Sequence, residues 1–168
     1  MCNRYGYLAP ISRLVDEFSQ VRIPLVFPDG AIPNIEPREH IRPTNTAPII
    51  RPLDPADPFV GVEIVDARWW LIPFFHRKSV KEWKPMCTNA RAETIATTAT
   101  FREAFKRRRC LVPATHFFEP YHNRQPVVLD PDQWATWLDL AADPAPCLRA
   151  GLEGVIAVER ASEASMLG

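Results

Sequence analysis

The stretch Val60-Gly61-Val62-Glu63-Ile64 decides the fold class that the sequence predicts. Its apolar residues alternate with Gly61 and Glu63, and a period of two is typical of a strand with one buried face. Residues 69–72 follow shortly afterwards and are predicted to form a second strand that pairs with the first. A β-sheet is therefore expected in the core of the protein.

Three helices are predicted around this sheet. The first is capped by Ser12 and has apolar residues three or four positions apart over 14–21, which is the spacing of one helical face. The second covers 101–108. The third begins at Asp130, which is followed by proline at the first helical position and by Gln133 at the third. The predicted helices are short and leave most of the chain to strands and loops.

Further strands are expected on both sides of the central stretch. Residues 23–58 are rich in proline and are predicted as loop, with one extended piece at 47–51. Three more strands are predicted, at 110–118 with an interruption at Pro113, at 125–129 and at 154–158. The order of strands and helices predicts one α+β domain over residues 1–168, with a mostly antiparallel sheet.

Composition excludes several classes of protein. The chain has 168 residues with 18 prolines, and this much proline argues against an all-helical bundle. Its 20 Lys and Arg balance its 20 Asp and Glu, which argues against a protein that coats nucleic acid by bulk attraction. It has neither a secretion signal nor a long apolar segment, so a cytoplasmic protein with no membrane partner is expected. Its four cysteines have no close pair, so neither a zinc knuckle nor a disulfide framework is indicated, and no metal or cofactor is predicted.

Cys2 is the residue with the most distinctive chemistry. The initiator methionine is generally removed before a small residue, which would leave Cys2 with a free α-amine beside its thiol. The pKa of the α-amine is about 8 and that of the thiol is about 8.5, so part of the amine is neutral at physiological pH. A 1,2-aminothiol forms a Schiff base with an aldehyde and then closes a stable thiazolidine ring. Taken alone, a cysteine at this position is more often an accident of sequence.

Several blocks elsewhere in the chain change that assessment. They occur in the order Met1-Cys2-Asn3-Arg4-Tyr5, Arg42-Pro43-Thr44-Asn45-Thr46-Ala47-Pro48, Trp69-Trp70-Leu71-Ile72-Pro73, Asn89-Ala90-Arg91-Ala92-Glu93-Thr94, Arg109-Cys110-Leu111-Val112-Pro113-Ala114 with Phe117-Phe118-Glu119, and His122-Asn123-Arg124-Gln125-Pro126. Together they resemble the SOS response-associated peptidase (SRAP) family of abasic-site processing proteins. The resemblance implies a barrel-like sheet and a protein that captures the ring-opened aldehyde of an abasic site in single-stranded DNA.

The same resemblance implies four catalytic residues. Cys2 would be the nucleophile, exposed by removal of Met1, which gives the family its autopeptidase label. Asn89 would hold the cysteine end and the opened sugar by hydrogen bonds. Glu119 would move protons during Schiff-base formation, a task that suits a carboxylate partly withdrawn from water. His122 would assist ring opening and reversal of the crosslink.

The resemblance also implies DNA contacts. Arg4 and Arg91 would bind phosphate, because the planar guanidinium matches phosphate oxygens. Pro48 and Phe75 would form an apolar wedge that separates bases beside the lesion, although Phe75 could equally be a core residue. The basic run 106–109 is either a DNA face or, more often for such runs, a solvated helix end.

One departure from the family concerns the length of chain between Glu119 and His122. In the family several tens of residues separate the Glu119 strand from the His122 loop, whereas here Pro120 and Tyr121 alone lie between them. Residues 1–119 and 120–168 are therefore interpreted as two parts of one domain joined across an internal deletion. Lost strands would expose sheet edges and apolar faces.

Three functions are compatible with the sequence. The first is covalent capture of abasic single-stranded DNA by a monomeric protein that joins the nucleoid when bound. The second is a noncatalytic single-strand binder or degenerate family member, which the deletion favours. The third is a general cysteine protease, for which no additional Cys/His pair with an orienting group is found.

Overall fold

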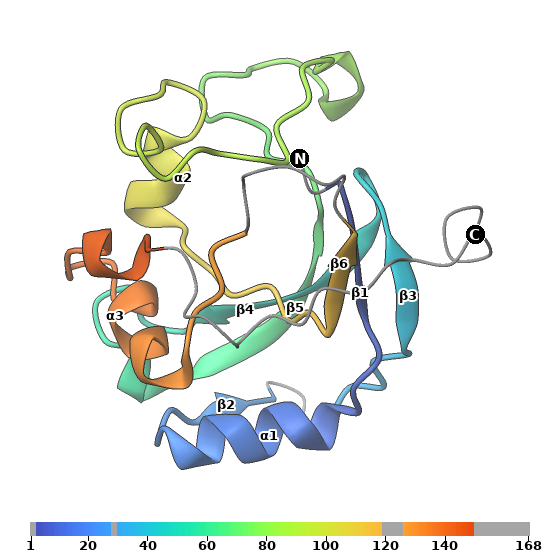
Figure 1. The fold of residues 1–168 in the computed structure, drawn as a ribbon, viewed down its shortest axis with the longest axis vertical. Coiled ribbons are helices and arrows are strands. Elements are labelled where there is room, and N and C mark those ends of the chain that lie inside the picture. The colour runs from blue at the N-terminus through green and yellow to red at the C-terminus, as the bar shows by residue number, and fades with distance from the viewer. Residues whose placement is uncertain (1–2, 28–29, 119–125, 150–168) are drawn as a thin grey trace.

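The computed structural model describes residues 3–27, 30–118 and 126–149 (Figure 1). Within these ranges the strands are β1 (Arg4–Tyr7), β2 (Leu25–Val26), β3 (Arg38–Ile41), β4 (Thr46–Pro52), β5 (Val62–Arg68) and β6 (His116–Phe118). The α-helices are α1 (Ile11–Gln20), α2 (Arg102–Arg107) and α3 (Trp134–Leu138). Four single-turn 3-10 helices complete the set: η1 (Pro58–Val60), η2 (Val80–Glu82), η3 (Pro131–Gln133) and η4 (Ala145–Cys147).

The strands form two three-stranded sheets. One has the order β3-β1-β6 and is antiparallel throughout, and the other has the order β2-β5-β4, in which only the β2–β5 pair is parallel. The predicted α+β class with mostly antiparallel strands is confirmed. The barrel-like closure that the resemblance implied is not found, because within the described part of the chain the strands remain in two separate sheets.

The segment that precedes β6 links the two sheets. Leu111 exchanges two backbone hydrogen bonds with Ile50 of β4, at 2.8 and 2.9 Å, while β6 pairs with β1 in the other sheet. Pro113 lies between these two pairings and has no N–H to give to a ladder. The predicted strand over 110–118 is therefore divided at its proline, and its two ends belong to different sheets.

The apolar faces of these elements make two clusters. In the larger one Phe18 of α1 packs on Trp134 with ring centroids 4.8 Å apart, and Val62 of β5 is fully buried. The smaller one joins Tyr5, Ile41 and Ala47 from β1, β3 and β4. In Figure 1, α1 and β2 lie at one end of the molecule, and the loop-rich chain between β5 and α2 lies at the other. No helix in the described ranges is long and apolar enough to cross a membrane.

Some local predictions are confirmed. The predicted strand at 47–51 corresponds to β4, and the helix at 101–108 corresponds to α2. The strand predicted at 60–64 corresponds to β5 only from Val62 onward, because Val60 belongs to η1. Asp130 caps a helical segment as predicted, and the Asp130 N–H donates to Gln133 Oε1 at 3.0 Å; the first turn of this segment is the 3-10 helix η3, and α3 begins only at Trp134.

Other local predictions are wrong. Residues 69–72 form no strand, because β4 and β2 already occupy both edges of β5. The proline-rich loop contains β2 and β3, which tertiary pairing stabilises. The first helix begins at Ile11 after Pro10, without a side-chain cap from Ser12. Residues 126–129 are not a strand, and the strand predicted at 154–158 lies outside the described residues.

Gly6 allows close packing across the β3-β1-β6 sheet. The His116 ring of β6 lies over Gly6, and its Nε2 donates to the Glu39 carbonyl oxygen of β3 at 3.0 Å. A Cβ atom at position 6 would overlap that ring and lie 2.5 Å from the same oxygen. The hydrogen bond across the central strand therefore requires glycine at position 6.

Gly6→Ala is expected to destabilise the protein by about 2 kcal/mol, because overpacking forces His116 or the neighbouring strand to move. Thermal unfolding of the wild type and the variant measures the effect. The double variant Gly6→Ala/His116→Ala should recover only part of the loss, since the Glu39 carbonyl stays in place. A Gly6→Ala protein as stable as the wild type would contradict this account.

Candidate functional site

Five of the eight predicted site residues fall within the described residues. These are Arg4, Pro48, Phe75, Asn89 and Arg91. The other three, Cys2, Glu119 and His122, lie outside them. The described part of the candidate site therefore consists of the other five residues and of the strands that adjoin Cys2 and Glu119 in the chain.

The pairing of β1 with β6 brings two chain positions from far apart in the sequence next to each other. Arg4 is opposite Phe118, Tyr5 is opposite Phe117, and Gly6 is opposite His116. Phe118 is followed directly by Glu119, and Arg4 is preceded by Asn3 and Cys2. Consecutive Cα atoms are about 3.8 Å apart, so this pairing limits how far Cys2 and Glu119 can be from one another.

Arg4 lies on the face of this sheet that carries Phe118. Its Cζ atom is 4.0 Å from the centre of the Phe118 ring, a cation–π contact. The rings of His40 and His116 also pack on Phe118, with centroids 5.2 and 5.3 Å away. The guanidinium is thus held beside the strand ends that adjoin Cys2 and Glu119. Its role as a phosphate ligand stays a prediction.

Trp69 connects β1 to the turn before β4. Its ring meets Tyr5 edge-on at 4.7 Å, and its backbone N–H and C=O bond to Asn45 and Thr44, at 2.8 and 3.1 Å. Thr44 has a φ of 78°, a left-handed conformation that costs energy for a β-branched residue. In the sequence this turn is part of the block that runs from Arg42 to Pro48, for which no structural role was predicted. The structure shows that it holds Trp69 against the first strand.

The segment that carries Asn89 is tied to the residues after Trp69. Trp70 Nε1 donates to the Pro85 carbonyl at 3.0 Å, and the Leu71 N–H donates to the Cys87 carbonyl at 3.3 Å. Cys87 is buried, whereas Asn89 is exposed and donates from Nδ2 to Thr88 Oγ1 at 3.1 Å. A chain of contacts thus runs from β1 through Trp69 to the loop of Asn89.

Arg91 begins a series of turns that leads to α2. Its carbonyl accepts from the N–H groups of Thr94 and Ile95, at 3.1 and 2.9 Å, so its backbone is fixed, while the residue itself is exposed. An exposed guanidinium on a fixed backbone suits phosphate binding. That role stays a prediction.

The two residues expected to form a wedge differ in exposure. Pro48 is buried in β4 opposite Asp66. Phe75 is 44% exposed and packs edge-on against Phe74 and Trp83, with centroids 5.7 and 6.0 Å away. Only Phe75 therefore has a large free surface in this structure, and the wedge itself remains untested.

Arg109 corrects the prediction for the basic run 106–109. It is only 5% exposed, and its guanidinium donates to the carbonyls of Phe105, Trp137 and Asp139. Burial lowers the pKa of this guanidinium from its usual value. Lys106 and Arg108 are exposed, so only they and Arg107 remain as a candidate surface. Arg109 instead joins α2 to the end of α3.

The cysteines of the described ranges are poor nucleophiles. Cys87 and Cys147 are 6% and 2% exposed. Burial raises the pKa of Cys110 from 9.0 to about 11, and it also raises the pKa of Cys147. No group of three His, Cys, Asp or Glu side chains suited to a metal occurs in the described part of the chain.

Iodoacetamide treatment of the native protein at pH 8 to 9 is expected to leave Cys110 unmodified, because its thiol remains protonated below its raised pKa. The same treatment in denaturant should label it fully. Peptide mass spectrometry measures both states. Labelling of Cys110 at equal rates in the native and denatured protein would show that the thiol is not shielded.

Several known proteins are similar to a large part of this chain. The model of the SOS response associated peptidase (SRAP) family matches residues 1–121. The chain is 31% identical over 120 residues to the abasic site processing protein YoaM of Bacillus subtilis (strain 168), which covers 71% of this chain and 47% of that protein. It is 28% identical over 120 residues to the abasic site processing protein YoqW of the same bacterium and of Bacillus phage SPbeta. The chain spans about half the length of the curated relatives it matches.

Proposed function

The chain belongs to the SOS response associated peptidase (SRAP) family, and from that premise we propose that it captures abasic sites in single-stranded DNA through a covalent bond to Cys2. The observation that carries the proposal is the pairing of Arg4 with Phe118. Because Arg4 and Phe118 are neighbours across the sheet, the segment that leads to Cys2 and the segment that leads to Glu119 begin next to each other. A nucleophile and a proton-transfer group must come within hydrogen-bond reach to act together.

The proposed reaction begins once Met1 is removed. The neutral α-amine of Cys2 attacks the C1′ aldehyde of the ring-opened abasic sugar, and loss of one water gives an imine. The thiol sulfur then adds to the imine carbon, and its proton goes to the nitrogen, which closes a thiazolidine. The net change is the condensation of one aminothiol with one aldehyde and the release of one water.

Each remaining catalytic residue has one task in this proposal. Glu119 gives a proton to the departing hydroxyl and accepts one from the amine. Asn89 donates a hydrogen bond to the opened sugar, and His122 assists ring opening. Arg4 and Arg91 neutralise phosphates beside the lesion, and Phe75, the exposed residue of the predicted wedge, separates its neighbouring bases while the buried Pro48 supports the strand behind it. No metal or cofactor takes part in the proposed chemistry.

The shielding of the other thiols supports Cys2 as the nucleophile. Cys87 and Cys147 are buried, and the raised pKa of Cys110 keeps it protonated. Those three cysteines also have no α-amine, so none of them can close a thiazolidine ring. A stable adduct with an aldehyde is therefore expected at Cys2 alone.

A second candidate is a noncatalytic binder of single-stranded DNA. The specific observation in its favour is that the family match ends at residue 121, so it does not include His122. Such a protein would bind damaged and undamaged strands alike and form no covalent adduct. Its binding would weaken with salt, as expected for phosphate contacts.

One experiment separates the two candidates. The purified full chain is incubated with a single-stranded oligonucleotide that contains one abasic site and, as the control, with the same oligonucleotide without it. Covalent capture predicts a band of protein plus DNA on a denaturing gel with the abasic strand only. Intact mass must first confirm that Met1 is absent. If folded and correctly processed protein gives no such band, the noncatalytic binder is favoured.

A further inference from the structure

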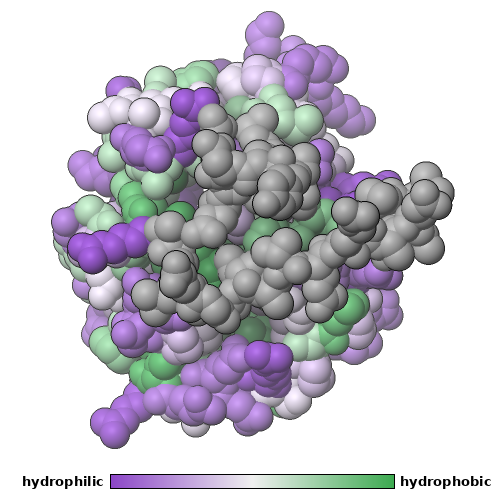
Figure 2. Space-filling model, in the orientation of Figure 1, coloured by the Kyte–Doolittle hydropathy of each residue, from purple (hydrophilic) through white to green (hydrophobic). Residues whose placement is uncertain are grey.

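A cleft of about 320 Å³ lies between α2 and residues 140–144, which follow α3. Both walls are on the same side of the molecule (Figure 1), where Figure 2 shows hydrophobic and hydrophilic residues side by side. None of the five described site residues lines this cleft. Its volume is that of a site for a small ligand.

Hydrogen bonds fix both walls of the cleft. In the wall formed by residues 140–144, the Leu140 N–H donates to the Pro55 carbonyl at 2.8 Å, and the Ala142 N–H donates to the Asp139 carbonyl at 3.1 Å. The other wall is a helix, whose backbone is bonded internally. The cleft is therefore already formed in the unliganded chain, as most small-molecule sites are.

Phe105, Leu140 and Pro144 give the cleft an apolar lining. All three are half-buried, and the Phe105 ring packs on Trp137 with 5.9 Å between centroids. An apolar group that enters the cleft would contact these side chains and leave water, which the hydrophobic effect favours. The cleft therefore suits a ligand with an apolar body.

The charged part of the lining is mostly positive. Among the described residues it consists of Arg102, Lys106 and Arg109, with Glu103 as the one carboxylate. The Glu103 carboxylate lies 3.6 Å from Arg107 Nε and 3.9 Å from Arg102 Nε, so cations of its own helix already neutralise it. Lys106 has no carboxylate within 4.0 Å in the described part of the chain. The cleft therefore attracts anions.

Arg109 contributes a buried charge to the cleft, since it is only 5% exposed. A guanidinium has five N–H groups. Four hydrogen bonds join this one to the carbonyls of Phe105, Trp137, Asp139 and Ala142. One N–H on Nη1 is therefore left without a partner among the described residues. A carboxylate that entered the cleft could accept from it.

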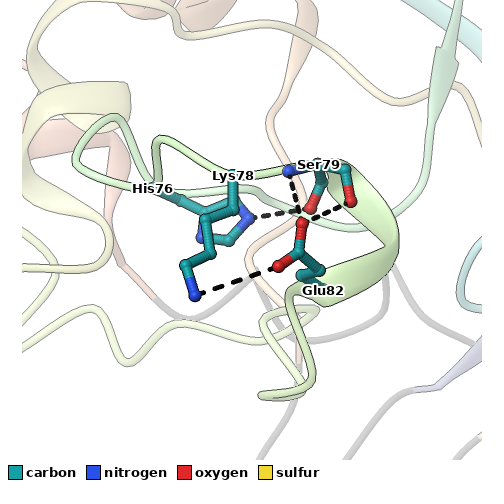
Figure 3. A network of polar contacts seen from close by, with 4 residues as sticks. All are labelled: His76, Lys78, Ser79 and Glu82. Atoms are coloured by element: carbon teal, nitrogen blue, oxygen red, sulfur yellow. Dashed lines mark hydrogen bonds and ion pairs between the residues drawn. The ribbon is translucent and has the colours of Figure 1, made fainter.

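The buried guanidinium also has no direct counter-charge. Asp139 and Asp143 attract Arg109, but neither carboxylate is within 4.0 Å of it. Each accepts a nearby backbone N–H instead, at 2.8 and 3.0 Å. The loop of η2 shows a direct pair for comparison, because Glu82 lies 3.9 Å from Lys78 Nζ (Figure 3). Buried charges in proteins are usually paired, so an anionic ligand would complete the environment of Arg109.

We propose that this cleft binds a small carboxylic acid, with its apolar body against Phe105, Leu140 and Pro144 and its carboxylate between Lys106 and Arg109. A carboxylate has one charge and two oxygens, which matches one N–H of Arg109 and the Lys106 ammonium. The same group occurs on a free acid and on the C-terminal residue of a peptide. The binding is separate from capture of DNA, because it uses none of the described site residues.

A chemical-shift titration of the ¹⁵N-labelled full chain with 4-phenylbutyrate tests the site. The expected dissociation constant is on the order of 1 mM, and the shifts should concentrate in α2 and residues 140–144. The neutral analogue 4-phenylbutan-1-ol has the same body and should bind at least about tenfold more weakly, because it lacks the charged acceptor. Equal binding of acid and alcohol, or no shifts in these two walls at saturating acid, would overturn the proposal.

Variants test the charges of the lining. Lys106→Gln should weaken binding of 4-phenylbutyrate about threefold, whereas Glu103→Gln should tighten it about twofold by removing a like charge. The matched control is Lys78→Gln, an exposed lysine in the loop of η2 that does not line the cleft. It should bind as the wild type does, and thermal melts verify that each variant is folded. Equal losses in Lys106→Gln and Lys78→Gln would overturn the role of Lys106.

A peptide arm of the titration identifies the source of the carboxylate. The tripeptide acetyl-Gly-Gly-Phe is compared with its C-terminal amide. Tighter binding of the tripeptide acid than of 4-phenylbutyrate would support the C-terminus of a partner protein as the ligand, and weaker binding would support a free acid. An amide that binds as well as the tripeptide acid would overturn the proposal. Cys2→Ser should bind 4-phenylbutyrate as the wild type does, so failure of DNA capture and failure of this site are measured separately.

Discussion

Replacing Cys2 by serine is expected to abolish the denaturant-resistant adduct with abasic single-stranded DNA. The serine amine can still form an imine with the aldehyde, but an imine hydrolyses readily, and the hydroxyl is a far weaker nucleophile than the thiol. Only sulfur closes the stable five-membered ring. The band on a denaturing gel should therefore disappear with Cys2→Ser, which tests the sulfur separately from the amine.

Two controls make the result specific. Serine is also small, so Met1 should be removed from Cys2→Ser as from the wild type, and intact mass verifies this. Cyanoborohydride reduces an imine to a stable amine, so adding it should restore a covalent band in the variant. An equally strong band from Cys2→Ser without the reductant would show that the captured aldehyde is held by some group other than the thiol.

Replacing Arg109 by methionine is expected to destabilise the fold by about 3 kcal/mol. The guanidinium joins α2 to α3 by donating to the carbonyls of Phe105 and Trp137, at 3.0 and 2.7 Å, and to that of Asp139. It also lies 5.9 Å from the Phe105 ring centre and 5.8 Å from that of Trp137. Methionine fills similar space but leaves buried carbonyls without their charged donor.

The expected loss corresponds to a melting temperature lower by about 10 °C for a chain of this size. Arg108→Met is the matched control, because Arg108 is the neighbouring residue and is exposed; it should change stability by less than about 0.5 kcal/mol. A net stability of about 5–15 kcal/mol leaves little reserve for such a loss. Equal melting temperatures for the two variants would refute the role of Arg109 as a buried link.

Local structure was predictable where one short stretch carries the whole signal. The alternation through Val62 and Ile64 identified β5, and the Asp130 and Gln133 pair identified the start of a helix. β3 escaped prediction because its residues, Arg38 to Ile41, have no apolar alternation and are held by pairing with β1. Strand pairing with a distant segment leaves no local pattern.

The candidate site also has some features that the sequence predicts and others that only the structure shows. Motif order predicts roles for Asn89 and Arg91, but the position of the Asn89 loop follows from contacts through Trp69 and Cys87 that no spacing reveals. Arg109 looked like one more cation of a basic run, and only the packing of α2 against α3 shows that it is buried.

The sequence by itself determined the α+β class, the family resemblance and the presence of a cysteine at position 2, because composition, motif order and residue identity are properties of the chain. Only the tertiary structure decided that Arg4 pairs with Phe118, that the strands form two separate sheets, and that Phe75 is exposed while Pro48 is buried. The reason is physical. Hydrogen-bonded pairing between strands more than a hundred residues apart depends on how the whole core packs.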